Sequence, residues 1–399
     1  MKIICLSSIE DTAFIQQSLL TEKLSTADGN YNYRLIKGID ANNDSKCVLF
    51  NYVPVGSYPL YKKIILKSSA WKKDKRTGST NVGFINISGL KQISLVINYI
   101  CHLKAILSTS QEPVYIICYD LFLPFLLTIS HLKRRFPTLI ACLVIPSIPE
   151  YDFVRNWKER INCKLSRYRM KMASRFNCFV FLTEQMKEKI PTNNYVVIEG
   201  ISPEINKNTS YCSYHKSPKD HFKIAYTGRL DKLYHIDDLI EAVQKIKQYD
   251  LELILCGNGD LVKWIKDIAS FDRRIKYLGF LDAESISKLQ SEVDVLINTR
   301  SPEGEYTKFS FPSKTMEYLA SGTPVLMHRL PGIPIEYDKY LNYFNGSDIN
   351  SIITGIEYVI EGCISGEAIA KALHAREFIM YYKTPEKQGK KVINLFEGQ

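Results

Sequence analysis

The alternation of short apolar runs with longer helical segments is the feature that most constrains the fold of this chain. The runs are almost continuously apolar, as in strands that are buried on both faces of a parallel sheet. In the first half they lie at 2–6, 47–53, 83–88, 114–119, 139–145, 178–182 and 195–198. In the second half they lie at 222–227, 251–256, 275–278, 293–298, 324–327 and 341–344. This order predicts an α/β fold with two Rossmann-like, doubly wound domains.

Helix-length segments separate most of these runs. In the first half they are 93–107, 122–135 and 154–175. In the second half they are 236–248, 261–269, 285–290, 312–321, 349–360, 367–381 and 386–396. Ligands of such sheets bind at the carboxyl ends of the strands, so we expect two domains that face each other across a ligand-binding cleft.

A change of composition marks the domain boundary. Residues 202–220 are rich in Pro, Ser, Asn, Lys and Tyr and have no apolar period, which is typical of a linker. We therefore predict a first domain at 1–201, a linker at 202–220 and a second domain at 221–380. A last helix, within 381–399, is able to cross back to the first domain.

Cysteine usage and hydropathy bear on the cellular location. The ten cysteines include no C-x-x-C pair and no cysteine–histidine cluster at zinc spacing, so we expect no metal site and a reducing, cytoplasmic compartment. The N-terminus lacks a secretory signal pattern. The stretch 116–132, which is the most apolar, is interrupted by Asp120 and Pro124, so we predict no membrane-spanning helix.

The net charge of +10 is concentrated in two segments, 62–76 and 152–175. Such clustering indicates an anionic partner near the first domain: phospholipid, a lipid diphosphate or nucleic acid. Nucleic acid is the least favoured of the three, because neither segment contains a recognisable reader motif or aromatic platform.

The segment 311–325 has the strongest local signal for chemistry. Pro312 suits the first turn of a helix and Gly322 suits its end. The free N–H groups and the dipole at such a helix start favour a phosphate, and Ser313 and Lys314 add a hydroxyl and a cation. Glu317 lies on the same face as Ser313, where its carboxylate can accept hydrogen bonds from a ribose. Alternatively, Lys314 and Glu317 form only a surface ion pair.

This segment resembles the donor-nucleotide helix of retaining GT-B glycosyltransferases of the family 4 type, the glycosyl transferases group 1. It resembles in particular the bacterial capsule and exopolysaccharide members. Other matching segments follow the same order along the chain, and they are 226–230, 234–242, 256–259, 278–280 and 329–334. The resemblance covers about 179–393. It implies the GT-B fold and sugar transfer from a nucleotide sugar, without a metal or another cofactor.

The resemblance also implies roles for individual residues. Donor-binding roles fall on Gly228, Arg229, Lys232, Gly257, Ser313, Lys314 and Glu317. Arg229 and Lys314 would neutralise the leaving diphosphate, which can itself take the acceptor's proton, so catalysis would rest on positioning and charge. Gly228 is predicted to form a tight turn after the first strand of the second domain. The glycines of Gly257-Asn258-Gly259 either admit the nucleotide base or form a turn and cap.

Several departures from the family pattern leave the activity open. The first of two glutamates expected eight residues apart would fall on Phe309, so Glu303 or Glu305 would have to replace it. Tyr234 stands where a lysine is common, and no loop histidine is evident, since His102 and His131 fall in helix-like segments. A catalytically impaired GT-B partner of another transferase is therefore an alternative. A nucleotide-sugar epimerase of the same fold is a third.

Two segments of the first domain are candidates for the acceptor side. The stretch 146–151 resembles an acceptor stretch of related transferases, with Ser147 in place of an aspartate, and Glu150 would hold an acceptor hydroxyl or merely start a helix. The segment 154–175 carries an apolar stripe that includes Trp157. Basic residues flank this stripe at Lys158, Arg160, Lys164 and Arg167. They suit an anionic membrane surface, or only a solvated face of a packed helix.

These observations together predict a specific reaction. We expect a hexose or N-acetylhexosamine to pass, with retention, from a nucleotide-diphosphate sugar, favouring a UDP-sugar, to a lipid-linked oligosaccharide. The enzyme would serve cell-surface polysaccharide synthesis as a peripheral protein on the cytoplasmic face of the membrane.

Overall fold

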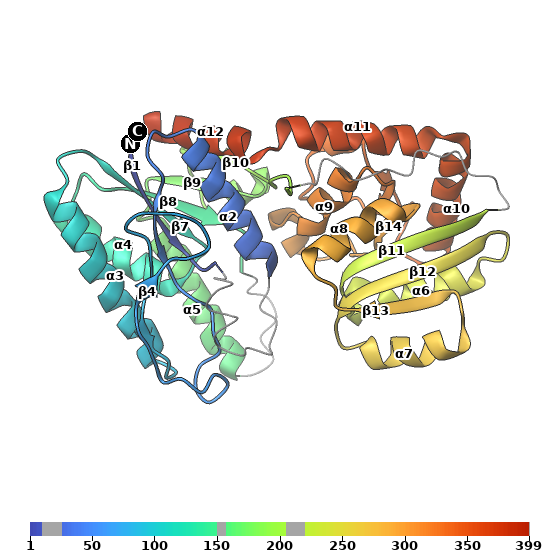
Figure 1. Ribbon diagram of the computed structural model, residues 1–399, viewed down its shortest axis with the longest axis horizontal. Coiled ribbons are helices and arrows are strands. Elements are labelled where there is room, and N and C mark those ends of the chain that lie inside the picture. Colours follow the sequence, from blue (N-terminus) through green and yellow to red (C-terminus); the bar gives the residue numbers. More distant parts are fainter. Residues whose placement is uncertain (10–25, 150–156, 205–219, 399) are drawn as a thin grey trace. The chain divides into compact units, whose positions relative to one another are not determined.

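The structure of the protein is a computed structural model, which describes residues 1–9, 26–149, 157–204 and 220–398, apart from the side chains of 26–28, 158 and 159 (Figure 1). The chain forms two compact units. Unit 1 consists of Met1–Ile201 together with Pro385–Gln399, and unit 2 consists of Ser202–Thr384. The predicted helix 154–175 is described from Trp157, and its first residues lie outside the described part.

Unit 1 contains an eight-stranded sheet in the order β10-β9-β8-β7-β1-β2-β5-β4. Its strands are β1 (Lys2–Ser7), β2 (Val48–Asn51), β4 (Ser69–Ala70), β5 (Thr80–Asn81), β7 (Val114–Tyr119), β8 (Ile140–Ile145), β9 (Cys178–Phe181) and β10 (Tyr195–Val197). All neighbours are parallel except β4 and β5 at the edge. The α/β prediction is therefore confirmed for this unit.

The helices of unit 1 lie in two layers. They are α2 (Thr26–Ala41), α3 (Leu90–Thr109), α4 (Leu123–Arg135), α5 (Trp157–Ala173) and α12 (Pro385–Glu397), with a 3₁₀ turn at Glu184–Glu188. Residues of α2 and α12 share one core cluster with alternate residues of the strands. The other residues of these buried strands point to the opposite face, which the row α3, α4, α5 covers.

The contact between α2 and α12 depends on glycine. A Cβ on Gly389 would lie 2.2 Å from the carbonyl oxygen of Gly38, so the two helix backbones touch where they cross. Any larger side chain at either position would push the helices apart. The C-terminal helix is thereby part of the core of unit 1, because Val392, Ile393 and Phe396 are buried there.

One predicted strand is wrong in position and partner. The prediction placed a strand of the main sheet at 83–88, but only β6 (Phe84–Ile85) is extended, and it pairs antiparallel with β3 (Ile65–Leu66) in a separate two-stranded ribbon. Asn86 turns inward directly after β6 and donates to the carbonyl oxygens of Gly56 and Lys63. The backbone of Asn86 is paired as well, because its N–H donates to the carbonyl of Ile64 and its carbonyl accepts from the N–H of Tyr58.

Unit 2 contains a six-stranded parallel sheet in the order β13-β12-β11-β14-β15-β16. Its strands are β11 (His221–Arg229), β12 (Asp250–Asn258), β13 (Ile275–Gly279), β14 (Val295–Asn298), β15 (Val325–Met327) and β16 (Asn342–Tyr343). Counted along the chain, this is the 3-2-1-4-5-6 order of a Rossmann fold. The order reverses between β11 and β14, and that is where such sheets bind ligands.

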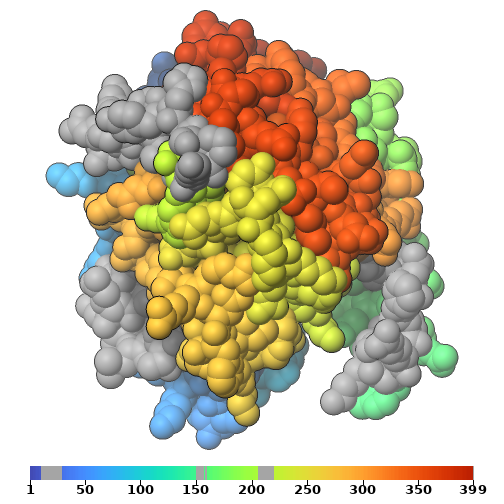
Figure 2. All heavy atoms as spheres, turned by 90° about the vertical axis from the view of Figure 1, so that its right-hand side faces the viewer, coloured from blue at the N-terminus to red at the C-terminus, as the bar shows by residue number. Residues whose placement is uncertain are grey.

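The helices of unit 2 are α6 (Ile236–Lys245), α7 (Val262–Phe271), α8 (Ala283–Glu292), α9 (Ser313–Ser321), α10 (Ile349–Ser365) and α11 (Glu367–Tyr382). Three short 3₁₀ turns are η2 (Lys232–Tyr234), η3 (Glu305–Phe309) and η4 (Ile335–Tyr337). Buried Ile236, Leu239, Ile240 and Val243 form the inner stripe of α6. In Figure 2 the segments of unit 2 run from yellow through orange to the red of α10 and α11.

Candidate functional site

The candidate site lies at the carboxyl edge of the sheet of unit 2, around the point where the strand order reverses. Strand β11 ends at Arg229 and β14 ends at Asn298, and these two strands are neighbours. Helix α9 begins at Ser313, after the loop that follows β14. The structure therefore brings the predicted residues Arg229, Ser313, Lys314 and Glu317 to one edge of one sheet.

The side chain of Arg229 is held by Asp231. Arg229 Nε donates to Asp231 Oδ2 at 2.7 Å, while the arginine side chain remains 68% exposed. The second oxygen of Asp231 accepts from the backbone N–H of Asp260 at 2.8 Å. Burial opposes the charge of Asp231, but these two donors outweigh it and hold the pKa of that carboxyl below its usual range. The guanidinium is therefore anchored through Nε, and its terminal nitrogens carry further N–H donors of the kind that bind phosphates.

Gly228 does not form the tight turn that we predicted, because β11 continues through it to Arg229. Its register partner on β12 is Gly257, which has a φ of +139°. A Cβ on Gly257 would lie 1.8 Å from the carbonyl oxygen of Gly228. The two glycines thus let the ends of β11 and β12 approach each other closely. Strand β12 extends to Asn258, and the predicted turn is present only from Gly259, whose carbonyl accepts from the N–H of Val262 at 3.3 Å.

Helix α9 ends as the sequence predicts, with Gly322 in the left-handed conformation, but it begins one residue later than predicted, because Pro312 is the N-cap and not part of the first turn. No side chain caps its first turn, and Ser313 is exposed there. Lys314 Nζ lies 2.7 Å from Glu317 Oε2, and both side chains are half-buried. The ion pair that the sequence left as an alternative is therefore present. The ammonium and the carboxylate of this pair are the groups that the sequence analysis assigned to the diphosphate and the ribose.

Tyr318, which the sequence analysis did not single out, anchors α9 to β11. It is fully buried, accepts from the backbone N–H of Thr227 at 2.9 Å and donates to the Thr227 carbonyl at 3.3 Å. Burial raises the pKa of Tyr318 to about 12, so it remains a neutral donor. Gln290 binds the Thr227 hydroxyl at 3.1 Å. Because Tyr318 follows Glu317 and Thr227 precedes Gly228, these bonds fix α9 beside the end of β11.

The loop residues proposed near the donor sugar differ in their positions. Phe309, which stands where the first glutamate is expected, is buried in the core of unit 2. Glu303 and Glu305 are exposed, with Glu305 at the start of η3. Lys232 is also exposed, and its Nζ is 3.9 Å from Asp237 Oδ2.

Two further residues at this edge were missed. Arg300, two residues after β14, donates to the Ser310 hydroxyl at 3.1 Å and lies over the ring of Tyr306. His328 directly follows β15, is buried, and packs on Phe344 with ring centroids 4.6 Å apart. The signal that would have found both is a polar side chain within two residues of the end of a buried strand.

The buried position of His328 predicts a pH-dependent stability. Burial, with a smaller effect of His235, lowers its pKa from 6.5 to about 4. As the pH falls, the unfolded chain therefore takes up a proton at this residue before the folded chain does, which favours unfolding. The contribution of His328 to the free energy of unfolding is complete above pH 6.5 and is lost as the pH falls towards 4. We expect up to about 3 kcal/mol of unfolding free energy to depend on this group.

The measurement is urea unfolding of the wild type and of His328→Gln across this pH range. The variant should show the smaller loss of unfolding free energy on acidification. Parallel curves for the two proteins would mean that His328 titrates normally in the folded state.

The predicted acceptor and membrane residues lie in unit 1. Ser147 is exposed two residues after β8, and Glu150 lies outside the described residues. On α5, the side chains of Trp157, Arg160, Lys164 and Arg167 are exposed. Lys158 belongs to the same helix, but its side chain is not described. Within the described part of the chain, no group of three His, Cys, Asp or Glu side chains could hold a metal ion.

The sequence and the structure were compared with those of known proteins. Residues 221–360 match the family described as glycosyl transferases group 1. A search of curated protein sequences finds no match. Sucrose-phosphate synthase from Thermosynechococcus elongatus is similar in structure at 14% identity, with a TM-score of 0.66 over 100% of this chain and 99% of that one.

Two other solved structures are similar over the same extent. HepE of Anabaena, in complex with UDP, has 15% identity and a TM-score of 0.61 over 100% of both chains. The catalytic domain of starch synthase IV from Arabidopsis thaliana, bound to ADP and acarbose, has 10% identity and a TM-score of 0.63, covering 100% of this chain and 99% of that one. The chain therefore has the GT-B fold with two Rossmann-like domains, and residues 221–360 of its second unit are similar to the glycosyl transferases group 1.

Proposed function

We propose that the protein is a retaining glycosyltransferase that moves a hexose or N-acetylhexosamine from a nucleotide-diphosphate sugar, a UDP-sugar by preference, to a lipid-linked oligosaccharide. Binding of the nucleotide-sugar donor is supported by one observation. Arg229 and the start of α9 both lie at the carboxyl edge of a Rossmann sheet, where the strand order reverses. Similar structures contain UDP, in HepE, or ADP, in starch synthase IV.

The chemistry needs little from the protein beyond positioning and charge. The bond between the sugar's anomeric carbon and the diphosphate breaks, and the acceptor hydroxyl bonds to that carbon on the same face. The acceptor's proton passes to an oxygen of the leaving diphosphate. Arg229 and Lys314 would stabilise the charge that grows on this diphosphate, and the first-turn N–H groups of α9 would add their dipole. Glu317 would accept hydrogen bonds from the ribose.

The proposal of a lipid-linked acceptor is supported by the exposed basic and aromatic side chains of unit 1. Helix α5 exposes Trp157 beside Arg160, Lys164 and Arg167, a pattern suited to an anionic membrane surface or a lipid diphosphate. A lipid-linked acceptor would be reached from such a surface. We therefore propose a peripheral enzyme at the cytoplasmic face of a membrane, in the synthesis of a cell-surface polysaccharide such as a capsule or exopolysaccharide.

Two observations favour a second candidate, a catalytically impaired partner of another transferase. Phe309 occupies the position of the first glutamate. In addition, the two cations proposed to neutralise the diphosphate are paired with carboxylates of the chain itself, Arg229 with Asp231 and Lys314 with Glu317. Such a partner would still bind the nucleotide.

The deciding experiment incubates the purified protein with a panel of nucleotide sugars and a lipid-diphosphate-linked saccharide, and follows the product by mass. Transfer supports the enzyme, and the anomeric configuration of the product tests retention. Nucleotide binding without transfer to any acceptor would support the partner role. Failure to bind any nucleotide would contradict both candidates.

We expect Glu317→Gln to weaken UDP binding about tenfold, because it replaces a charged acceptor of the ribose hydroxyls with a neutral one. Isothermal titration of UDP measures the change. The matched control is Glu292→Gln, which removes the carboxylate of another lysine–glutamate pair in unit 2, at the exposed end of α8. Equal affinities for all three proteins would remove Glu317 from the nucleotide site.

A further inference from the structure

Helix α3 of unit 1 is apolar, yet the fold covers little of it. Among the described residues it is the one helix with the length and composition of a membrane span, but only 22% of its most apolar window is buried. The buried stripe contains Lys91, Leu95, Tyr99 and Leu103, which lie one helical turn apart. Ile93 and Ile97 lie outside this stripe and are 58% and 54% exposed.

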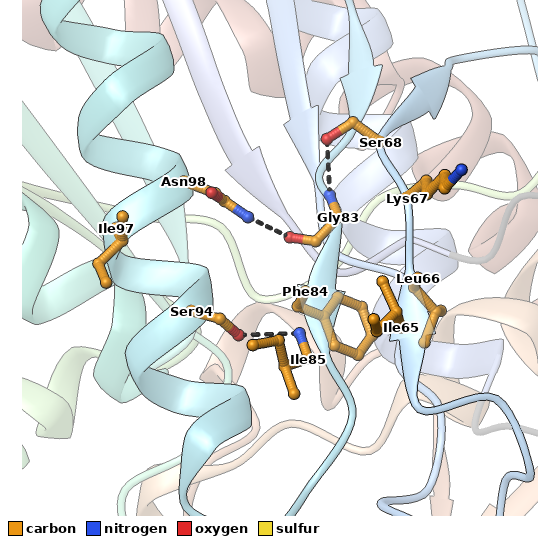
Figure 3. A pocket seen from close by; sticks show the side chains of 10 residues that line it. All are labelled: Ile65, Leu66, Lys67, Ser68, Gly83, Phe84, Ile85, Ser94, Ile97 and Asn98. Carbon is orange, nitrogen blue, oxygen red and sulfur yellow. Dashed lines mark hydrogen bonds between the residues drawn. The ribbon is translucent and has the colours of Figure 1, made fainter.

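The β3–β6 ribbon continues this apolar surface. Ser94 of α3 accepts a hydrogen bond from the backbone N–H of Ile85 at 3.0 Å, and Asn98 donates to the carbonyl of Gly83 at 2.7 Å (Figure 3). An open groove of about 370 Å³ lies between ribbon and helix, lined in part by Ile65, Ile85 and Ile97. Ile65 is 67% exposed. We call the exposed side chains Ile64, Ile65, Ile85, Leu90, Ile93 and Ile97 the α3 face.

The chain around the α3 face is strongly basic. Residues 54–109 contain nine lysines and arginines and a single acidic residue, Asp74. Asp74 is already engaged by Arg76, at 3.1 Å. Lys62, Lys63 and Lys67 adjoin the apolar ribbon and are exposed. An apolar surface with a basic border is what an anionic bilayer attracts, through burial of the apolar side chains and through charge.

We propose that the α3 face is a membrane-docking surface, on which α3 and the β3–β6 ribbon insert their isoleucines into the interface of an anionic bilayer while Lys62, Lys63 and Lys67 bind lipid phosphates. This deepens the proposed function by naming a docking face apart from α5, but it does not depend on transfer activity. The helix lies in the membrane plane and does not cross it. Its Lys91 stripe packs into unit 1, where Lys91 Nζ donates to the carbonyl of Val55.

The experiment is sedimentation with vesicles of equal parts phosphatidylcholine and phosphatidylglycerol at low salt, with pure phosphatidylcholine for comparison. Two variants test the face: Ile65→Glu/Ile93→Glu/Ile97→Glu, and Lys62→Glu/Lys63→Glu/Lys67→Glu. The matched control is Phe271→Glu/Ile335→Glu/Tyr358→Glu, which places the same charges on exposed apolar positions of unit 2. We expect each test variant to bind anionic vesicles about a hundredfold more weakly than the wild type, and the control to bind like the wild type. Circular dichroism checks that all remain folded.

The proposal would be overturned if the wild type did not bind anionic vesicles, or if the test variants bound them as tightly as the wild type does. Loss of all binding in the α5 variant Arg160→Glu/Lys164→Glu/Arg167→Glu, while both test variants bind normally, would also overturn it. A wild-type dimer that the isoleucine variant dissociates, with vesicle binding unchanged, would assign the face to a second copy of the chain. Failure of transfer to a soluble acceptor analogue, with vesicle binding intact, would contradict only the proposed function.

Discussion

Replacing Arg229 by alanine is expected to lower kcat/KM for sugar transfer by about a hundredfold or more, the usual cost of losing one charged donor to the transition state. Arg229 ends β11 at the point where the strand order reverses, and Asp231 fixes its Nε. A guanidinium held in this way needs little reorganisation when charge develops on the leaving diphosphate. The effect should appear in kcat more than in KM, since the charge grows during bond breaking.

The control separates this role from a general loss of positive charge. Arg273→Ala removes an exposed arginine that precedes β13, at the opposite, amino-terminal edge of the same sheet. It should leave kcat/KM within a factor of about two, as surface substitutions away from a site do. Arg229→Lys should recover part of the activity, because it restores the charge without the bidentate fork. An unchanged kcat/KM in Arg229→Ala would make this residue a surface partner of Asp231 and nothing more.

The sequence sufficed for the fold where the physical signal is local. Strands such as β7 and β12 are buried on both faces, so their apolar runs are continuous and easily recognised. Helix α2 was not predicted, since it contains two glycines and its apolar residues are interpretable only against α12, which follows more than 340 residues later in the chain. The short β3–β6 ribbon was missed for a similar reason: two residues give no periodicity.

The site follows the same rule. Arg229, Lys314 and Glu317 lie within local patterns, a strand end and a helix start, so their location at the sheet edge was predictable from the sequence. The residues that hold them in place were harder to predict from the sequence. That Asp231 holds Arg229 and that Tyr318 ties α9 to Thr227 depends on how side chains from different elements meet in space. Gly228 was assigned to a turn because its pairing with Gly257 is invisible without the register of β11 and β12.

Because Gly228 pairs with Gly257, we expect Gly257→Ala to lower the free energy of unfolding by about 4 kcal/mol or more. The new Cβ would lie 1.8 Å from the carbonyl oxygen of Gly228, so two central strands must separate. The φ of +139° adds strain that an L-residue cannot relieve locally. Losses of this size come from overpacking and backbone strain in a core, and both act here.

Gly279→Ala is the matched control, because Gly279 also has a positive φ, +72°, but a Cβ there meets no atom within 4 Å. It isolates the cost of the left-handed backbone, about 1 kcal/mol. Urea unfolding of the three proteins measures both losses, and soluble yield gives a second readout where Gly257→Ala does not fold. If Gly257→Ala cost no more than Gly279→Ala, β11 and β12 would have room to separate at their carboxyl ends, and Arg229 and Asp260 would not be held in the fixed arrangement from which the Arg229 prediction starts.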